Sequence, residues 1–445
     1  MTRRLRAVLV LAAALAAPAV ASAADPKPAT PIKHFVFLMQ ENHTFDNYFG
    51  AYPGADGRPA NVCQPIDVHD PAKGCVKPEH LGSKAVLDLG HSRAVFQAQY
   101  RNGRMDGFVD AYARTGEKGT LPVGYYDDRD IPYYYNVADN YVLFDRFFSS
   151  AHAGSGVNHV FWVTATPGNA DSESLPKDGF KDLPTIFDRL EAAGVSWKFY
   201  VQNYDPTNTF RNPAKGDRAS QTVWVPLLAY PRYLDDPKLF SHIQDLGQYY
   251  RDAQAGTLPA VAFIAPAGSS EHPPGRIQAG QTFVRTILTE MMRSPEWPTS
   301  AFMWSYDDWG GWYDHVKPPQ IDAAGYGFRV PTLLVSPYAR KGFVDHVTMD
   351  YTSALKFIEE NWGVAPLADR DRRANSIASA FDFTQAPRPP VLLDLSRTPA
   401  QHQSVRTSIV YQSYGAALVS PLLIVALGGC ALLFRRRRIR RKDAT

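Results

Sequence analysis

The sequence predicts an α/β protein with a mostly parallel sheet, helices on both faces of that sheet, and one C-terminal transmembrane helix. Residues 34–39, HFVFLM, form a short apolar run that is typical of a strand buried on both faces. Segments with helical and strand-like patterns alternate between residues 183 and 306, in the βαβ rhythm of a parallel sheet. Residues 415–434 hold no charge, and at about 1.5 Å per residue such a helix spans about 30 Å of hydrocarbon.

The first 23 residues have the order of a secretory signal peptide. Basic residues from Arg3 to Arg6 precede the apolar residues 7–17, and Ala21-Ser22-Ala23 supplies a small-residue cleavage site. A short buried helix would not explain this order of charged, apolar and small residues. We therefore expect the mature chain to begin at residue 24, in an oxidising compartment.

The other end of the chain predicts a membrane anchor. The uncharged run is followed by seven basic residues in the eight positions from Arg435 to Lys442. Positive charge stays on the cytoplasmic side of a membrane, so we expect residues 24–412 to lie outside, in the periplasm or at the cell surface. The predicted organisation is a signal peptide (1–23), a folded domain (24–384), an extended proline-rich tether (385–412), a single-pass transmembrane helix (413–434) and a basic cytoplasmic tail (435–445).

The overall basic charge resides in these two ends. The formal net charge is +3, and subtracting +3 for the signal peptide and +6 for the tail leaves about −6 for the external part. A net negative domain gives no support to a nucleic-acid partner.

Polar side chains follow the first predicted strand directly. Gln40, Glu41 and Asn42 come next, then Thr44 and Asp46. Polar groups at the carboxyl end of a buried strand mark the crevice where open α/β sheets bind ligands, and carboxylate and amide oxygens suit a divalent metal. The alternative interpretation is that Asn42 and Thr44 only cap the next helix.

A long insertion and a lone histidine motif come next in the chain. Residues 51–81 are rich in proline, glycine and aspartate, and Cys63 and Cys75 in them predict a disulfide. Two cysteines without a nearby histidine pair make a poor zinc site. His91 lies in Asp88-Leu89-Gly90-His91-Ser92, ahead of residues 94–100 with helical spacing, and on its own this pattern favours a helix cap or a surface residue.

A glycine-rich turn carries a candidate nucleophile. The aromatic stretch 131–150 favours a helix that packs Tyr134, Val137, Tyr141 and Phe144 into the core. In the turn 151–159, Gly154 and Gly156 flank Ser155 and would allow its hydroxyl a close approach to a metal or a phosphorus atom. Ser155 could also be a structural turn residue. The competing hydroxyls are Ser149, Ser150 and Thr164.

The remaining elements complete the predicted sheet. Helices are expected at 183–193, 278–293 and 352–361, strands at 195–201, 258–265, 300–306 and 326–336, and a loop-rich segment that covers the site at 202–240. The strand at 300–306 ends at Asp307 and Asp308, which precede Gly310, Gly311 and His315. Oxygen and imidazole ligands from one tight turn suit a metal site.

These motifs together resemble a bacterial phosphoesterase family that holds the large phospholipases C and an acid phosphatase branch. The family opens with Glu-Asn-x-Ser/Thr-Phe-Asp-x-Tyr-Phe-Gly, which matches residues 41–50, and the likeness continues in order to about residue 384. The resemblance implies an alkaline phosphatase-like fold and makes residues 24–384 the phosphoesterase catalytic domain. The chain departs from its relatives at Asp308, where they usually have Glu, and at Gly156-Val157, where they often have a proline before the Asn.

The resemblance also implies roles for the candidate residues. Ser155 is the expected nucleophile, acting through a phosphoserine, and His272 (in Glu271-His272-Pro273-Pro274) and His315 are the other expected catalytic residues. His91 and Asn158 are expected to bind substrate. The expected ligands of a divalent metal ion of unspecified identity are Glu41, Asn42, Asp307 and Asp308.

The expected function is therefore metal-dependent hydrolysis of phosphoric esters outside the cell membrane. The first hypothesis is a phospholipase C-like phosphodiesterase, with membrane phospholipid as a candidate substrate. The second is a phosphomonoesterase of the acid phosphatase type. A third hypothesis, of another class, is a surface protein that keeps the fold without catalysis and serves adhesion. The sequence gives no indication of oligomeric state.

Overall fold

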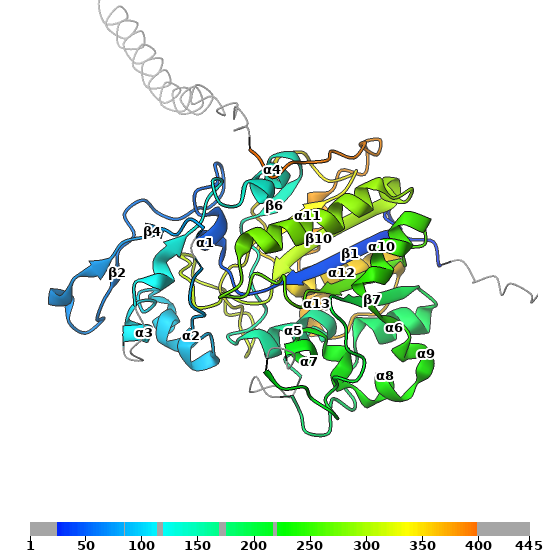
Figure 1. Cartoon of the computed structure of the whole chain (residues 1–445), viewed down its shortest axis with the longest axis horizontal. Helices are drawn as coiled ribbons and strands as arrows, with labels where there is room; N and C mark the ends of the chain where they lie inside the picture. The colour runs from blue at the N-terminus through cyan, green and yellow to red at the C-terminus, as the bar shows by residue number, and fades with distance from the viewer. Residues whose placement is uncertain (1–24, 84, 114–118, 169–174, 217–219, 398–445) are drawn as a thin grey trace, which may run out of the picture. The chain divides into compact units, whose positions relative to one another are not determined.

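The computed structural model describes residues 25–83, 85–113, 119–168, 175–216 and 220–397 (Figure 1). The chain divides into two units after Ser396, and the described residues of the first unit form one compact body. The predicted signal peptide, transmembrane helix and cytoplasmic tail lie outside the described residues. Within the described part of the chain, no helix is both long enough and apolar enough to cross a bilayer.

An eight-stranded sheet forms the centre of the first unit. Strand β11 runs antiparallel to both of its neighbours, β10 and β6, and every other pairing in the sheet is parallel, as predicted. Across the sheet the strands are β12 (Phe343–Asp345), β6 (Val142–Phe144), β11 (Thr332–Val335), β10 (Ser300–Tyr306), β1 (His34–Gln40), β9 (Val261–Ala265), β7 (Trp197–Val201) and β8 (Ile243–Asp245).

Strand β1 lies in the middle of the parallel part of the sheet. It pairs with β9 on one side and β10 on the other, and every residue after His34 is buried. A strand covered on both faces needs apolar side chains in both directions, which explains the continuous apolar run. Its register with β10 pairs Gln40 with Tyr306, so the residues that follow both strands emerge at the same edge.

Helices cover the sheet on both faces. Figure 1 shows α11 in front of the central strands and α12 behind them. The longer helices are α2 (Arg93–Tyr100), α4 (Pro132–Asn140), α5 (Ser155–Thr164), α6 (Ile186–Ala193), α10 (Leu246–Ala255), α11 (Ile277–Arg293) and α12 (Tyr351–Trp362). The short ones are α1 (Phe45–Phe49), α3 (Asp110–Ala113), α7 (Gln221–Trp224), α8 (Pro231–Asp235), α9 (Pro237–Phe240) and α13 (Asp369–Arg373).

Two elements differ from the sequence prediction. The helix expected across the aromatic stretch ends at Asn140, and Phe144 is buried on strand β6 instead of a helix. Pairing of β6 with β11 and β12 overrides the helical spacing, since three consecutive large apolar residues fit a strand buried on both faces. The strand expected at 326–336 is only four residues long, Thr332–Val335.

The predicted insertion and disulfide are both present. The insertion holds the two-stranded sheet of β2 (Gln64–Pro65) and β3 (Cys75–Val76), and β4 (Glu79–His80) pairs with β5 (Gly124–Tyr125) beside it. Cys63 is bonded to Cys75, with their Cα atoms 5.4 Å apart.

The first part of the predicted tether lies against the folded domain. Asn136 Nδ2 donates hydrogen bonds to the carbonyls of Asp394 and Ser396, at 3.0 and 2.9 Å. Trp297 Nε1 donates to the carbonyl of Arg388 at 2.9 Å. Residues 385–396 therefore form a strap on the folded domain.

Candidate active site

Four acidic and amide side chains meet where β1 and β10 end. Glu41 and Asn42 follow β1, Asp307 and Asp308 follow β10, and all four are fully buried. Asp307 N–H donates to the Gln40 carbonyl at 3.0 Å, and Asn42 N–H donates to Asp307 Oδ1 at 3.0 Å. The parallel pairing of the two strands thus continues for one residue into the site and brings together the side chains that the sequence predicted as metal ligands.

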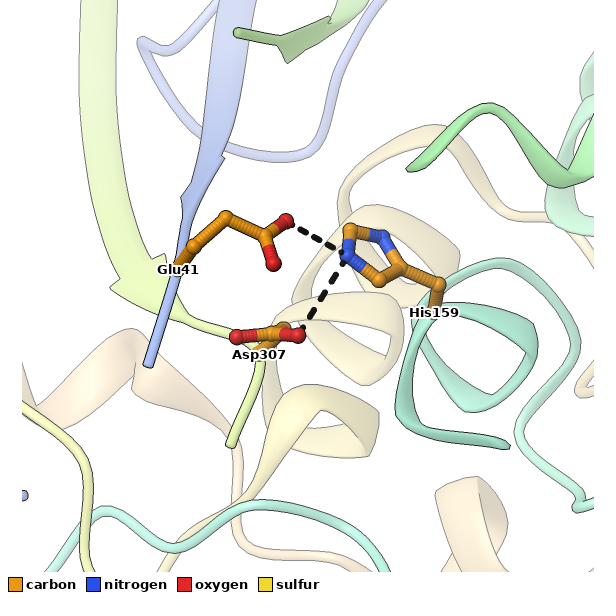
Figure 2. A group of neighbouring side chains, drawn as sticks. All are labelled: Glu41, His159 and Asp307. Atoms are coloured by element: carbon orange, nitrogen blue, oxygen red, sulfur yellow. Dashed lines mark hydrogen bonds and ion pairs between the residues drawn. The ribbon is translucent and has the colours of Figure 1, made fainter. Parts of the chain in front are cut away.

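Helix α5 delivers two further side chains to this cluster. Ser155, its first residue, donates a hydrogen bond from Oγ to Asp308 Oδ2 at 3.3 Å. One turn later, His159 Nε2 lies 3.0 Å from Glu41 Oε1 and 3.7 Å from Asp307 Oδ2 (Figure 2). Residues four apart project from the same face of a helix, so the start of α5 faces both strand ends.

The sequence analysis did not identify His159 as a site residue. The signal that could have found it is its spacing from Ser155, four residues ahead, but the sequence analysis interpreted residues 151–159 as a turn, whereas α5 begins at Ser155. Once α5 is known to be a helix, that spacing places both side chains toward the same crevice.

The cluster is electrostatically incomplete without a cation. Burial lowers the pKa of His159 to about 4, so its ring is neutral near pH 7 and does not compensate the carboxylates. Burial and the neighbouring charge of Asp307 raise the pKa of Glu41 well above its usual range. Among the described residues, no hydrogen-bond partner reaches three buried oxygens of this cluster: Glu41 Oε2, Asn42 Oδ1 and Asp307 Oδ2. Carboxylate, amide and imidazole groups with orphaned lone pairs fit a divalent metal ion.

A cavity of about 280 Å³ opens beside these groups. Glu41, Ser155, His91 and His272 all line it, and the two imidazole rings lie 5.8 Å apart between centroids. His91 Nδ1 lies 2.7 Å from the Leu89 carbonyl and therefore carries the proton. His91 Nε2 is then free to accept from Asn42 Nδ2, at 3.3 Å. The candidate nucleophile and two of the predicted histidines thus face one cavity.

The segment 202–240 forms another wall of this cavity, as predicted. Helix α7 packs against α5, and Val223 and Trp224 line the cavity together with the preceding Ser220. The proximity of Trp224 partly opposes the rise in the pKa of the Glu41 carboxyl. The sequence analysis predicted the cover but none of these three residues.

Asn158 holds the turn that presents Ser155. Its Oδ1 accepts from Ser150 N–H at 2.9 Å, and its Nδ2 donates to the carbonyls of Ala153 and Gly154 at 2.8 and 3.1 Å. The side chain is fully buried and does not line the cavity. In the structure this predicted substrate-binding residue therefore stabilises the backbone of the turn before Ser155.

His315 lies in a second polar cluster. Its Nδ1 is 2.7 Å from Asp46 Oδ2, and its Nε2 is 3.3 Å from Asp56 Oδ1. The fully buried Arg329 guanidinium pairs with Asp46 and Asp314 at 3.0 and 2.9 Å. Burial acts to lower the pKa of His315, but the hydrogen bond and charge of Asp46 outweigh it and raise the pKa. The structure does not bring this predicted catalytic residue to the cavity beside Ser155.

The competing hydroxyls have other partners. Ser150 Oγ donates to Asp350 Oδ2 at 2.8 Å, and Thr164 Oγ1 donates to the Val160 carbonyl at 2.8 Å. Ser149 Oγ lies 3.5 Å from the Phe328 carbonyl. Ser155 is the one of the four predicted hydroxyls that lines the cavity and contacts an acidic residue of the cluster.

Comparison with known proteins identifies relatives over most of the chain. The model of the Phosphoesterase family matches residues 32–365. Phospholipase C A of Mycobacterium tuberculosis is 30% identical, over 84% of this chain and 82% of its own length. Non-specific phospholipase C1 of Arabidopsis thaliana is 29% identical, over 80% and 72%. The non-hemolytic phospholipase C of Burkholderia pseudomallei is 29% identical, but this chain spans only 59% of its length.

Solved structures show a weaker likeness. A protein of the alkaline phosphatase superfamily from Vibrio parahaemolyticus has 13% identity and a TM-score of 0.38, with 78% of this chain and 72% of that chain covered. The assignment of an α/β fold with a mostly parallel sheet rests on the strand order and pairings described above.

Proposed function

The chain belongs to the phosphoesterase family and is a hydrolase of phosphoric esters, and from that premise we propose that it is a metal-dependent phosphodiesterase of the phospholipase C type. The observation that carries the proposal is the position of Ser155. Its hydroxyl stands at the start of α5, lines the cavity, and donates to Asp308, which belongs to a fully buried acidic cluster.

Ser155 is the proposed nucleophile. Its Oγ forms a bond to phosphorus as the ester oxygen leaves, and its proton passes toward Asp308, the acceptor of its present hydrogen bond. His272, which lines the same cavity, donates a proton to the leaving alkoxide. Water then attacks the phosphorus atom of the phosphorylated serine, and His272 takes up the proton of the water. The Ser155–phosphorus bond breaks, Asp308 returns its proton to Ser155 Oγ, and the phosphomonoester is released.

Glu41, Asp307, Asp308 and His159 would hold the metal ion, with Asn42 beside them. When bound, a divalent cation stabilises an ionised hydroxyl and the negative charge on phosphoryl oxygens. His91 lines the cavity and accepts from the Asn42 amide through Nε2; to bind a phosphoryl oxygen, that nitrogen would exchange Asn42 for the substrate and carry a proton.

We further propose that the enzyme is anchored in the cell membrane by residues 413–434, with the catalytic unit outside. Such an anchor makes lipid headgroups the most concentrated phosphate esters near the cavity, which is an effective-concentration argument for a lipid substrate. The names of the relatives, all phospholipases C, point in the same direction.

The test is an activity panel on the full-length protein in detergent micelles. We expect phosphatidylcholine to be hydrolysed to phosphorylcholine, with a larger kcat/KM than a soluble phosphomonoester at the same pH, and we expect a chelator to abolish both activities. If kcat/KM for phosphatidylcholine is well below kcat/KM for the soluble phosphomonoester, the result would favour a phosphomonoesterase of the acid phosphatase type. A protein that hydrolyses neither ester after metal addition would contradict the proposed function.

A further inference from the structure

The loop after β9 buries a carboxylate that the mechanism above does not use. Glu271 is only 2% exposed, and its backbone has φ +69°, in the left-handed region that non-glycine residues rarely adopt. Such a conformation is strained and persists only where surrounding contacts determine it. The next residue is His272, the proposed proton donor.

Three tyrosine hydroxyls hold the Glu271 carboxylate. Tyr48 and Tyr306 both donate to Oε2, at 2.6 and 2.7 Å, and Tyr134 donates to Oε1. Tyr48 comes from α1, Tyr134 from α4, and Tyr306 is the last residue of β10, directly before Asp307. One buried carboxylate therefore joins the loop after β9 to three other segments, two of which adjoin the acidic cluster.

Helix α11 leaves room for this side chain. A Cβ atom at Gly280 would lie 2.0 Å from Glu271 Cγ and 2.1 Å from Oε1, so any larger residue there would displace the carboxylate. Burial raises the pKa of Glu271 to about 7, while the hydrogen bonds from Tyr134, Tyr48 and Tyr306 act against that rise. The site is thus shaped for a carboxyl group with hydroxyl donors on both oxygens.

The residues on both sides of Glu271 contact the active site. The carbonyl of Ser270 accepts the Glu41 N–H at 3.0 Å. His272 N–H donates to Ser270 Oγ at 3.4 Å, and His272 Nδ1 lies 2.7 Å from the Pro273 carbonyl. With the proton on Nδ1 committed to that carbonyl, His272 Nε2 is the nitrogen left for substrate.

We propose that Glu271 is a positioning residue, held by the hydroxyls of Tyr48, Tyr134 and Tyr306, that fixes the His272 ring in the cavity for proton transfer to the leaving group. The inference rests on the proposed function. It predicts that loosening the carboxylate misplaces His272 while the metal cluster and Ser155 keep their geometry.

The experiment compares two diesters with the same headgroup and different leaving groups. p-Nitrophenyl phosphorylcholine releases a phenolate that needs little protonation, whereas an alkyl phosphorylcholine ester releases an alkoxide that does. The variants are Glu271→Gln and Tyr134→Phe, measured as full-length protein in micelles beside His272→Ala. Tyr133→Phe is the matched control, because Tyr133 is the neighbouring buried tyrosine on α4 and is not one of the three hydroxyl donors to Glu271 described above.

We expect Glu271→Gln and Tyr134→Phe to lower kcat for the alkyl ester by about 10-fold or more, and kcat for the nitrophenyl ester by less than about 3-fold, since general-acid catalysis is worth roughly 10²–10⁴-fold. KM and the metal Kd should stay within about 2-fold, and combining Glu271→Gln with His272→Ala should add no further loss. Tyr133→Phe should match the wild type.

The inference would be overturned if Glu271→Gln lowered kcat equally for the two esters. It would also be overturned if Glu271→Gln lowered kcat further in the presence of His272→Ala. If Glu271→Gln fails to fold, Tyr134→Phe alone decides, because it removes one hydroxyl and leaves the carboxylate in place. A wild type inactive on both esters would instead contradict the proposed function, so the two failures are distinguishable.

Discussion

Ser155 Oγ donates a hydrogen bond to Asp308 Oδ2 across 3.3 Å, which links the first residue of α5 to the end of β10. Ser155→Ala removes this hydroxyl and leaves the acidic side chains in place. We expect kcat for p-nitrophenyl phosphorylcholine to fall by at least about 10³-fold with metal binding retained. Ser220→Ala, which alters another serine of the cavity wall, should keep near-normal activity. Activity retained in Ser155→Ala would move the nucleophile to Ser149, Ser150 or Thr164.

His159 lies between Glu41 and Asp307 and is expected to be a metal ligand. His159→Gln should raise the metal Kd by about 10-fold or more, measured by titration calorimetry on protein stripped with a chelator. It should also reduce the increase in Tm that metal addition gives to the wild type. His346→Gln serves as the control, because the His346 side chain is 61% exposed and pairs with Asp145, outside the acidic cluster. An unchanged Kd would exclude His159 from the ligand set.

Glu359 makes the stability of the catalytic unit depend on pH. Burial, with a hydrogen bond and charge from Asp371, raises the pKa of Glu359 from 4.5 to about 9. The folded state therefore binds the Glu359 proton more tightly than the unfolded state. This proton stabilises the folded state fully below about pH 4.5, and the stabilisation is lost as the pH rises to 9.

Glu359→Gln removes this titration. We expect the free energy of unfolding of the variant to exceed that of the wild type by at least about 1 kcal/mol at pH 9, which corresponds to about 2–4 °C in Tm. At pH 5 the difference should be smaller. Differential scanning at the two pH values measures the effect. Glu360→Gln, at the neighbouring position with a side chain 53% exposed, should show no such difference. The same shift in both variants would contradict the assignment to Glu359.

The strap and the predicted anchor determine where a protease can release the enzyme. Residues 385–396 are hydrogen-bonded to the domain, so we expect a protease added to intact cells to cut after Ser396 and before residue 413. The released fragment should be active, and an epitope tag after Thr445 should stay protected inside the cell. Digestion of the tag in intact cells would contradict the proposed orientation.

Local patterns predicted most of the fold. Together with the family resemblance they named nine site residues, of which seven lie at the acidic cluster or its cavity. The polar residues after β1 and after β10 each indicated a possible metal site, and the family resemblance joined Glu41, Asn42, Asp307 and Asp308 in one ligand set. In the structure the four meet because the two parallel strands end at one edge of the sheet. The loop residue His272 and the turn residue Ser155 also reach the predicted cavity.

The site residues that the sequence analysis missed or misplaced are those whose roles depend on where their side chains point in the folded chain. His159 faces the cluster because α5 is a helix, whereas Asn158, one residue earlier, faces the turn backbone. His315 is drawn to Asp46 and Arg329, which are distant in sequence from each other. No local pattern reports such long-range pairings, and for the same reason the sequence did not show that Glu271 is held by three tyrosines.

The most direct test of the account is to identify the group that becomes phosphorylated during turnover. The full-length protein is mixed with p-nitrophenyl phosphorylcholine, stopped in acid within one turnover, digested and analysed by mass spectrometry. We predict a phosphorylcholine adduct on Ser155 that disappears as substrate is exhausted and is absent after metal removal. An adduct on another residue, or full turnover with no adduct on any residue, would contradict catalysis through Ser155.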